Sequence, residues 1–473
     1  MSNTFDIVVL GGGIGGYTAA IRAAQLGKSV AVVERDKLGG TCLHRGCIPS
    51  KALLRSAEVY GTMKRAGEFG VITDSVSFDL AQAQSRKAAI VEQLYIGLQF
   101  LMTKHKIHVV KGNGRIIGPS IFSPRSGSVA VELEDGEMET LVPGQLIIAT
   151  GSRPRMLPGL TPDGTRIMTS DDALNMERLP SSIVIIGGGV IGVEWATMLH
   201  EFGASVTVVE GERRILPTED EDVSRELERL FKKRGIRVMT GAKLQVESVE
   251  ALADGVKMSV ETAKGTEALA AETMLVCVGR IANADGIGLE NTDVRVDQGV
   301  IRVNGSMQTT EPHIYAVGDV SGGVQLAHAA GHEGVVAAEH AAGKTTHAYA
   351  AHLVPRCVYS SPEIASVGWT EKQAADQGFA VKTAKFSFKA LGKALVYGQS
   401  DGFVKVVADS ATNDILGVHI IGPQATELIS EAALAQMLDA TPWEVGGTIH
   451  PHPTLSEALG EAMMSIDGLS IGG

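Results

Sequence analysis

The chain has 473 residues, of which 44% are hydrophobic, 20% charged and 4% aromatic, with 56 glycines. This length exceeds one hydrophobic core and predicts roughly three domains of about 150 residues in a compact α/β protein. The net charge of −12 argues against a nucleic-acid partner, which requires clustered basic residues. We expect no membrane association and a cytoplasmic location, because no apolar run reaches about 18 residues and the N-terminus lacks the basic region of a signal peptide.

In chain order, two segments match without a gap, the second beginning 176 residues after the first. Residues 7–34 and 183–210 each predict a buried strand, a glycine turn, a helix of about a dozen residues and a strand that ends in glutamate. Each segment is therefore a predicted βαβ unit.

Both glycine turns match the G-x-G-x-x-G pattern, and both lie 23 residues before the closing glutamate. The first glycine permits the turn, the second lets the backbone approach a pyrophosphate, and the third permits close helix packing. The helix N-terminus adds free N–H groups and the positive end of its dipole, and each glutamate should accept hydrogen bonds from a ribose. The residues concerned are Gly11, Gly13, Gly16 and Glu34 in the first unit, and Gly187, Gly189, Gly192 and Glu210 in the second.

Two dinucleotide sites predict two dinucleotides. A nicotinamide needs a partner for hydride exchange, so we expect FAD in the first site and NAD in the second. Glu210 would repel the 2′-phosphate of NADP. Arg213 and Arg214 follow it in the chain and keep NADP open as an alternative.

The rest of the chain fits this plan. Residues 146–151 and 275–279 read as short strands that end in glycine, where the chain crosses between domains. Between the first βαβ unit and residue 146, the sequence predicts an amphipathic helix at about residues 85–106, and a separate α/β segment begins at about residue 350.

Of the four cysteines, Cys42 and Cys47 are the close pair. In a reducing compartment such a pair is more often catalytic or metal-binding than structural. The alternatives are half of a zinc site, for which no second Cys or His pair stands at metal-ligand spacing, and free thiols in the core; no metal is predicted. We expect Cys277 and Cys357, in apolar strand-like sequence, to be buried structural thiols.

The cysteine pair comes shortly after Glu34, so its thiols should lie near the flavin. Residues five apart on an ideal helix have Cα atoms about 8–9 Å apart, beyond the ~7 Å limit for a disulfide. A bridge therefore requires a distorted first turn, which Gly46 and Pro49 could permit. A strained bridge is also easier to reduce, as a catalytic one should be.

Near the C-terminus, His452 stands five residues before Glu457. Thiol exchange needs a base near neutral pH, and His452 oriented by Glu457 would supply one. The alternative is structural, because Thr454 and Glu457 also match a capping box that starts a helix. Spacing alone does not decide between these two interpretations.

Taken together, these residues resemble the pyridine nucleotide-disulfide oxidoreductases over nearly the whole chain, and within them the branch that oxidises dihydrolipoamide. The motifs that carry the resemblance are residues 39–51, 149–154, the second glycine turn with Glu194, 278–280, 315–319 and 452–457. The resemblance implies two Rossmann-like domains, for FAD and NAD, and a C-terminal α/β dimerisation domain. It divides the chain into an FAD-binding domain at 1–150 and 280–349, an NAD-binding domain at 151–279 and a dimerisation domain at 350–473.

The resemblance also implies roles for single residues. Cys42 would be the interchange thiol that faces the substrate, Cys47 the thiolate against the flavin, and His452 with Glu457 the base, supplied by the other subunit. Lys51 and Glu194 would pair beside the flavin. The further FAD-binding residues implied are Gly40, Thr41, Lys51, Gly114, Thr150, Gly151, Asp319, Gln325, Leu326, Ala327 and His328; the further NAD-binding residues are Val190, Ile191, Glu194 and Gly279.

The implied reaction is oxidation of protein-bound dihydrolipoamide to lipoamide with reduction of NAD. The enzyme would be an obligate homodimer that serves a lipoylated acyltransferase or lipoyl carrier protein of a 2-oxo acid dehydrogenase complex. The departures from the family pattern are His44-Arg45, the missing proline in residues 278–283 and Pro451, and they concern the carrier-facing surface. The alternatives are a glutathione-type reductase, against which Glu210 argues, and a non-catalytic NAD-binding redox sensor.

Overall fold

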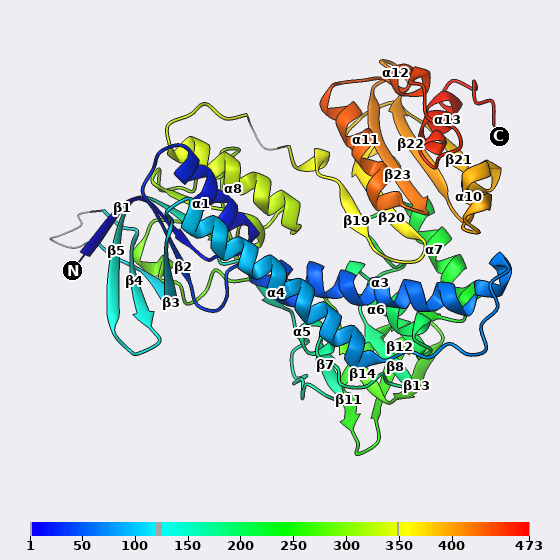
Figure 1. Cartoon of the computed structure of the whole chain (residues 1–473), viewed down its shortest axis with the longest axis horizontal. Coiled ribbons are helices and arrows are strands. Elements are labelled where there is room, and N and C mark those ends of the chain that lie inside the picture. The colour runs from blue at the N-terminus through cyan, green and yellow to red at the C-terminus, as the bar shows by residue number, and fades with distance from the viewer. Residues whose placement is uncertain (1, 120–124, 348–349, 473) are drawn as a thin grey trace. The chain divides into compact units, whose positions relative to one another are not determined.

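The computed structural model describes residues 2–119, 125–347 and 350–472 (Figure 1). These residues form two compact units, each assembled from separate stretches of the chain. The first unit comprises Met1–Leu53, Ala81–Arg155 and Arg280–Ala351, and the second comprises Leu54–Leu80, Met156–Gly279 and His352–Gly473.

The first unit is built on a sheet whose central strands carry the first glycine turn. Strand β1 pairs in parallel with β2 on one side and with β5 on the other, while β3 extends the sheet beyond β2 and β18 extends it beyond β5. The second half of β3 pairs with antiparallel β4, which also pairs with β5. The bounds are β1 Ser2–Leu10, β2 Val30–Glu34, β3 His108–Ile117, β4 Ser128–Leu133, β5 Met138–Ile148 and β18 Ile314–Ala316.

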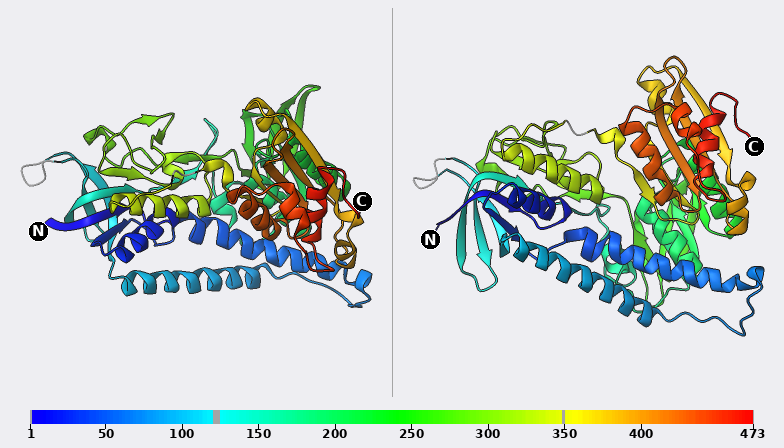
Figure 2. Two further views of the ribbon diagram at one scale, coloured as in Figure 1. Left: turned by 90° about the horizontal axis from the view of Figure 1, so that it is seen from above. Right: turned by 45° about the horizontal axis from the view of Figure 1, so that its top comes forward.

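Helices α1 (Ile14–Gln25) and α8 (Ala327–Ala341) lie side by side in this unit, as Figures 1 and 2 show. Glycines allow the close approach, because a Cβ added at Gly334 would lie 2.4 Å from the carbonyl oxygen of Gly15. A third helix, α4 (Leu80–Lys104), joins the same apolar core through buried side chains in its last turns. It begins five residues before the predicted start, because residues 80–84 are good helix formers outside the apolar pattern.

The second unit repeats this design around the second glycine turn. Five parallel strands lie in the order β10-β9-β8-β14-β7, and a separate antiparallel sheet contains β11, β12 and β13. Helix α6 (Val190–Glu201) connects β8 to β9 and has 12 residues, as α1 does. The predicted internal repeat is therefore present as two βαβ units. The bounds are β7 Ile167–Thr169, β8 Ser182–Ile186, β9 Ser205–Val209, β10 Arg237–Met239, β11 Lys243–Ala251, β12 Val256–Thr262, β13 Gly265–Ala271, β14 Thr273–Val276 and α7 Glu221–Arg234.

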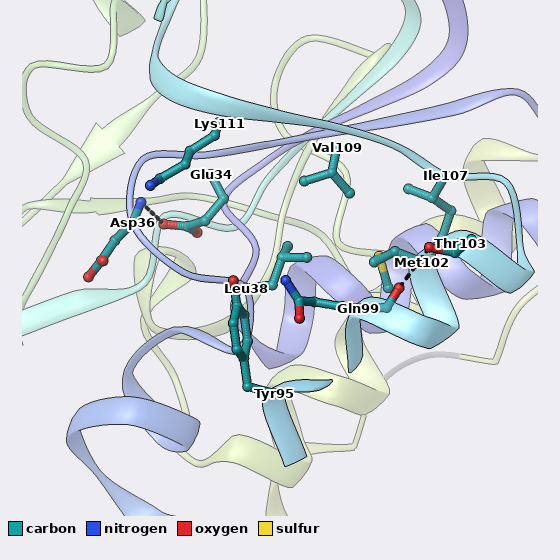
Figure 3. Close-up of a pocket in the computed structure, with 10 residues that line it drawn as sticks. All are labelled: Glu34, Asp36, Leu38, Tyr95, Gln99, Met102, Thr103, Ile107, Val109 and Lys111. Atoms are coloured by element: carbon teal, nitrogen blue, oxygen red, sulfur yellow. Dashed lines mark hydrogen bonds between the residues drawn. The ribbon is translucent and has the colours of Figure 1, made fainter. Parts of the chain in front are cut away.

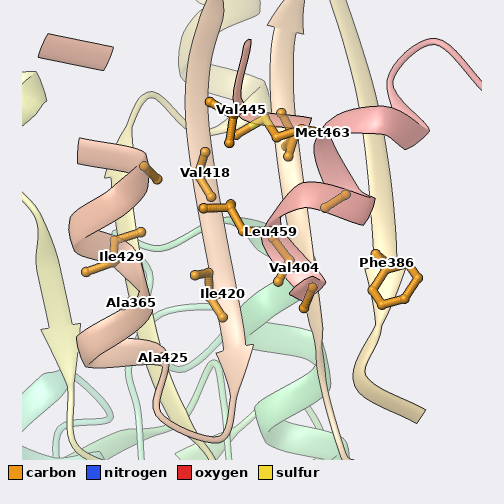
Figure 4. Close-up of a cluster of buried hydrophobic side chains, with 14 of the residues drawn as sticks. Ala365, Phe386, Val404, Val418, Ile420, Ala425, Ile429, Val445, Leu459 and Met463 are labelled. Carbon is orange, nitrogen blue, oxygen red and sulfur yellow. The ribbon is translucent and has the colours of Figure 1, made fainter. Parts of the chain in front are cut away.

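The C-terminal part of the second unit is an antiparallel sheet in the order β19-β20-β23-β22-β21. Helices α11 and α13 cover one face, and their apolar side chains pack with those of the central strands (Figure 4). The small helix α9 packs through Ala374 against Val407 and Leu416 in a separate apolar cluster. The bounds are β19 Arg356–Val358, β20 Glu363–Gly368, β21 Val381–Ser387, β22 Phe403–Asp409, β23 Ile415–Gly422, α9 Glu371–Asp376, α11 Ala425–Met437 and α13 Glu457–Ser465.

Shorter elements complete the two units. They are β6 Ser152–Pro154, β15 Arg280–Ala282, β16 Val296–Asp297, β17 Val300–Ile301, α5 Ser170–Ala173, α10 Gly392–Val396 and α12 Pro442–Gly447. The predicted α/β class is confirmed. In the described part of the chain, no helix is both long and apolar enough to cross a membrane.

Candidate active site and dinucleotide-binding sites

The first glycine turn has the geometry of a dinucleotide cradle. Gly11 has a φ of +109°, and a Cβ there would lie 2.3 Å from the carbonyl oxygen of Ala149, while a Cβ at Gly16 would lie 1.9 Å from the oxygen of Gly11. At Gly13 the nearest atom to such a Cβ is 3.9 Å away. The outer glycines are therefore required by packing, and the middle one leaves its backbone open to a ligand. Helix α1 begins beside it without a side-chain cap, so its first N–H groups can receive a pyrophosphate.

Glu34 closes the first βαβ unit with both carboxylate oxygens held by backbone amides. Oε2 accepts from the N–H of Gly12 at 2.7 Å and Oε1 from that of Asp36 at 2.8 Å. These bonds fix the carboxylate while leaving lone pairs for ribose hydroxyls. A cavity of about 360 Å³ opens beside it, with charged groups at one end and apolar groups at the other (Figure 3). The cavity is lined by Glu34, Asp36, Leu38, Tyr95, Gln99, Met102, Thr103, Ile107, Val109 and Lys111.

The second glycine turn repeats the first almost atom for atom. Gly187 has a φ of +107°, and a Cβ there would lie 2.3 Å from the carbonyl oxygen of Cys277. A Cβ at Gly192 would lie 1.9 Å from the oxygen of Gly187, whereas one at Gly189 would meet nothing within 4 Å. Helix α6 also begins without a side-chain cap. Both turns therefore fit a bound dinucleotide.

Glu210 is held in the same way as Glu34. Its Oε2 accepts from the N–H of Gly188 at 2.6 Å and its Oε1 from that of Glu212 at 2.7 Å. Arg214 donates to two backbone carbonyls of the loop that follows, at 2.8 and 2.9 Å, and so is committed to the fold of that loop. Arg213 is exposed. Of the two arginines that kept NADP open, Arg213 alone is therefore oriented to solvent.

The two close cysteines lie on either side of a break between helices. Helix α2 (Gly40–Arg45) carries Cys42, helix α3 (Cys47–Lys64) begins at Cys47, and Gly46 separates them with φ −149° and ψ −115°. No disulfide joins the two thiols in this structure. A hydrogen bond to Cys47 and burial raise the pKa of Cys42, while the charge of Lys51 acts in the opposite direction. The break supplies the distorted turn that the five-residue spacing requires.

The helix that carries Cys42 begins directly at the first glycine turn. Gly39 and Gly13 form a parallel bridge, and the N–H of Gly39 donates to the carbonyl oxygen of Gly12 at 2.8 Å. Gly39 and Gly40 have φ of +109° and +58°, a region that favours glycine. These contacts bring the cysteine pair next to the first dinucleotide cradle within one unit.

His452 and Glu457 lie together in the second unit. The Nδ1 of His452 is 2.8 Å from Oε1 of Glu457, whose Oε2 accepts from the N–H of Thr454 at 2.8 Å. Burial works to raise the pKa of Glu457, but the amide of Thr454 and the imidazole of His452 outweigh it, so the net shift of this pKa is downward. His452 itself has a side chain that is 80% exposed. An ionised carboxylate thus orients an accessible imidazole.

The capping-box alternative is present in part. Glu457 does reach back to the N–H of Thr454, and the hydroxyl of Thr454 donates to the carbonyl oxygen of Pro451, but among the described contacts no backbone N–H of the helix donates to that hydroxyl. Helix α13 begins at Glu457 with Ser456 as its N-cap and no side-chain cap bond. The carboxylate of Glu457 therefore makes both predicted contacts: one oxygen accepts from the backbone N–H of Thr454, and the other lies beside Nδ1 of His452.

Comparison with known proteins identifies the family. Residues 5–334 match the family model described as pyridine nucleotide-disulphide oxidoreductase, and residues 354–463 match the dimerisation domain of the same family. The chain belongs to the pyridine nucleotide-disulphide oxidoreductases. It is an NAD-dependent, FAD-containing disulfide oxidoreductase and a homodimer.

Relatives within the family agree with this assignment. The chain is 60% identical over 472 residues to the dihydrolipoyl dehydrogenase of Bacillus subtilis (strain 168), a match that covers 100% of both chains. It is 44% identical over 458 residues to that of Chlorobaculum tepidum, with 97% and 96% covered. Among solved structures, it is similar to LpdA from Mycobacterium tuberculosis, with a TM-score of 0.90, 29% identity and 98% and 99% covered. The HOCl-induced flavoprotein disulfide reductase RclA from Escherichia coli gives a TM-score of 0.84, 25% identity and the same coverage.

Two groups that sequence reasoning missed hold Asp319 in this oxidoreductase. The hydroxyl of Ser152 donates to Oδ2 of Asp319, and Nε of Arg280 lies 3.8 Å from the same oxygen and donates to Ser152 at 2.7 Å. Ser152 and Arg280 stand in two of the motifs that carry the family resemblance, but the sequence does not indicate that both contact Asp319. Thr150 likewise bonds the backbone of Asn283, which stands in the stretch without the usual proline.

A buried acid fixes the turn that precedes helix α8. Glu333, 3% exposed, accepts from the N–H of Gly318 at 2.6 Å. In the sequence, Glu333 stands in a segment of alanine, glycine, valine and histidine, and this pattern does not indicate which group the acid binds. Helix α8 begins at Ala327 with Leu326 as N-cap and no side-chain cap, so the implied FAD-binding residues 325–328 stand at the N-terminus of a helix.

Several other predicted residues lie apart from the glycine turns and the cysteine pair, and each has different surroundings. Gly114 lies in β3, opposite Val131 of β4, and a Cβ there would come within 2.6 Å of Leu10, so the missing side chain faces the core. Oε1 of Glu194 accepts from the N–H of Tyr359 at 3.0 Å. Gly279 has a φ of +104°. Cys277 is buried as expected, but the expectation for Cys357 was wrong, because Cys357 is only partly buried on β19.

Proposed function

We propose that the chain is a dihydrolipoyl dehydrogenase that oxidises protein-bound dihydrolipoamide to lipoamide and reduces NAD. The observation that carries the proposal is the pair Cys42 and Cys47, hydrogen-bonded across the helix break at Gly46 beside the first dinucleotide cradle. The 60% identity to the enzyme of Bacillus subtilis supports the choice of substrate. The partner would be a lipoylated acyltransferase or lipoyl carrier protein of a 2-oxo acid dehydrogenase complex, in the cytoplasm.

We assign the parts of the chain as the motifs suggest. Residues 1–150 and 280–349 bind FAD, residues 151–279 bind NAD, and residues 350–473 form the dimer interface. FAD would be held by the first glycine turn, Glu34, Gly40, Thr41, Lys51, Gly114, Thr150, Gly151, Asp319 and residues 325–328. NAD would be held by the second glycine turn with Val190 and Ile191, and by Glu194, Glu210 and Gly279.

The chain's own residues perform the thiol chemistry. His452 of one subunit removes a proton from a substrate thiol at its exposed imidazole, and Glu457 stabilises the charge that forms. In the oxidised enzyme, Cys42 and Cys47 are joined by a disulfide. The substrate thiolate attacks the sulfur of Cys42, this disulfide breaks, and Cys47 leaves as a thiolate. The second substrate thiol, also deprotonated, then attacks the sulfur bound to Cys42, so that the lipoamide disulfide forms and Cys42 is released.

The bound cofactors supply the electron chemistry, since FAD accepts two electrons from a dithiol and NAD accepts a hydride. The charge of Lys51 near the pair favours the thiolate form. The uncapped start of α8 would direct the positive end of its dipole toward the flavin.

The test compares two substrate pairs in the purified holoenzyme. We expect turnover of dihydrolipoamide with NAD, and none of glutathione disulfide with NADPH, which is the reaction of a glutathione-type reductase. The Cys47→Ser variant should lose this turnover, while Cys357→Ser, outside the proposed site, should retain it. Wild-type rates in the Cys47→Ser variant would refute the proposal, and inactivity with both pairs in the native protein would indicate a redox sensor.

A further inference from the structure

The loop that follows Glu210 is bonded directly to the second glycine turn. We call residues 211–220 the coenzyme loop. The N–H of Leu216 donates to the carbonyl oxygen of Gly188 at 2.8 Å, on the residue whose own N–H donates to Glu210. A Cβ at Gly188 would lie 2.7 Å from Cγ2 of Ile215. The loop therefore packs on the turn without spare room, and a shift of one moves the other.

The coenzyme loop is stiffened from within. The guanidinium of Arg214 donates to the carbonyl oxygens of Pro217 at 2.8 Å and Glu219 at 2.9 Å, and to the hydroxyl of Ser224 at 3.2 Å. The same hydroxyl donates to the carbonyl oxygen of Leu216 at 3.1 Å. These bonds join the two ends of the loop, so displacement at its far end is transmitted to Leu216.

That far end is anchored on the C-terminal antiparallel sheet by two buried acids. Glu219 and Asp220 are each 2% exposed. Glu219 pairs with Nε of Arg356 at 3.2 Å and accepts from the hydroxyl of Ser366 at 2.5 Å. Asp220 accepts from Nζ of Lys405 at 2.9 Å.

Lys405 is the centre of this anchor. Its ammonium, with a side chain 2% exposed, also donates to Asp222 and Glu371 at 2.7 Å each, so that three carboxylates use its three donors. Burial alone would lower the pKa of Lys405, but the bonds to these carboxylates outweigh burial and raise that pKa, so the ammonium stays charged. Lys405 lies on β22, which has strands on both sides, and this gives the anchor a rigid base.

Desolvation of the buried pair Lys405 and Asp220 offsets much of the attraction between these two charges, so the main effect of the pair is to fix geometry. We propose that Lys405 is a positioning residue for the coenzyme: it holds Asp220, and through the coenzyme loop it sets the place of Glu210 and the second glycine turn. This inference rests on the proposed assignment of NAD to that turn. It concerns coenzyme affinity and leaves the thiol chemistry untouched.

The test separates coenzyme binding from thiol chemistry in the FAD-loaded enzyme. In Lys405→Met, three carboxylates lose the ammonium that they share, and we expect the coenzyme loop to move. The dissociation constant of NADH, measured by fluorescence titration, should therefore rise roughly tenfold. The rate at which dihydrolipoamide reduces the bound flavin in a single turnover should be unchanged. The matched control is Lys372→Met, which removes an exposed ammonium paired with Asp376 on α9 and should alter neither quantity.

Native NADH affinity in Lys405→Met would overturn the proposal, and so would an equal loss of NADH binding and of flavin reduction, because that pattern indicates a general structural role. If Lys405→Met does not fold, Asp222→Asn takes its place. Asp222 is 27% exposed and keeps its position on α7, so its loss is milder, and we expect NADH binding roughly twofold to fivefold weaker. Unchanged binding in that variant would also overturn the proposal. Absence of NADH binding in the native enzyme would instead refute the proposed function.

Discussion

The thiol of Cys42 is hydrogen-bonded to the side chain of Cys47 across the helix break at Gly46, and this bond, with burial, raises the pKa of Cys42. The bond requires Cys42 to keep its proton while the sulfur of Cys47 accepts, which suits a pair in which Cys47 carries the negative charge. Replacing Cys47 by alanine removes the acceptor. In Cys47→Ala we expect alkylation of Cys42 by iodoacetamide to titrate at lower pH than in the reduced native protein. Cys357→Ala is the control, and an unchanged midpoint in Cys47→Ala would contradict the assignment.

The pair His452 and Glu457 should be sensitive to the charge of the carboxylate. The net lowering of the Glu457 pKa keeps it ionised at neutral pH. Glu457→Gln preserves the shape but cannot stabilise an imidazolium, so kcat with dihydrolipoamide should fall about 100-fold. The matched control is Glu431→Gln, whose acid lies 2.8 Å from His450 in a second His–Glu pair. Similar losses in both variants would argue against a specific role for Glu457.

The same shift makes a prediction for stability. Because the folded-state pKa of Glu457 lies below its unfolded value, its contribution is present above the ordinary pKa of 4.5 and is lost as pH falls through the lowered value. Native protein and Glu457→Gln should therefore differ most in thermal unfolding near neutral pH. The difference should shrink in acid, and a constant gap down to pH about 3 would contradict the shift.

Two glycines of the second turn should respond differently to alanine. A Cβ at Gly192 would lie 1.9 Å from a backbone oxygen, so Gly192→Ala should destabilise the protein by about 1–3 kcal/mol. A Cβ at Gly189 meets nothing within 4 Å, so Gly189→Ala should unfold at the native temperature but bind NADH more weakly. Thermal unfolding and NADH titration of both variants check this contrast. Equal losses of stability would mean that Gly189 is not an open ligand position.

Coenzyme preference should depend on Glu210 and Arg213. Glu210→Gln removes the charge that opposes a 2′-phosphate and keeps one carbonyl oxygen, which can accept from one of the two backbone amides that Glu210 binds. The ratio of kcat/KM for NADP over NAD should rise roughly tenfold. Because Arg214 is committed to its loop, a further Arg213→Ala change should remove most of the gain. A gain that survives it would assign phosphate recognition to another group.

A buried histidine should make the C-terminal sheet sensitive to acid. Burial lowers the pKa of His419, with partial compensation from Asp220 and Glu219, and its Nδ1 has no hydrogen-bond partner among the described residues. A histidine with a lowered folded-state pKa stabilises the unfolded state as pH falls through its ordinary value of 6.5. His419→Gln can still donate to the carbonyl oxygen of Trp369 and should lose less stability between pH 7 and pH 5 than the native protein, measured by urea unfolding. An identical pH dependence would exclude His419 as the cause.

Local patterns in the sequence carried much of the fold. The glycine turns at Gly11 and Gly187, with a glutamate 23 residues later, predicted both βαβ units, because each step of such a unit depends on residues close in the chain. Helix geometry predicted a distorted turn between Cys42 and Cys47 for a bridged pair, since residues five apart on a regular helix have Cα atoms too far apart for a disulfide. Helix limits were less accurate, as α4 shows.

Contacts between distant residues could not be read in this way. Ser152 and Arg280 both contact Asp319, and Glu333 accepts a hydrogen bond from Gly318. The pattern of a single sequence does not indicate which side chains far apart in the chain come into contact. The anchor of Lys405 on Asp220 joins residues 185 apart in the chain. Both residues look like ordinary surface charges in the sequence, and they are buried only in the assembled structure.

The sequence by itself determined the two glycine turns, the close cysteine pair and the candidate base, because turns, helix starts and cysteine spacing depend on residues that are close in the chain. The tertiary structure decided which arginine faces solvent, how one carboxylate serves both His452 and the backbone of Thr454, and where the coenzyme loop is anchored. Those outcomes depend on burial and on the meeting of charges across packed elements, and both arise only when the sheets assemble.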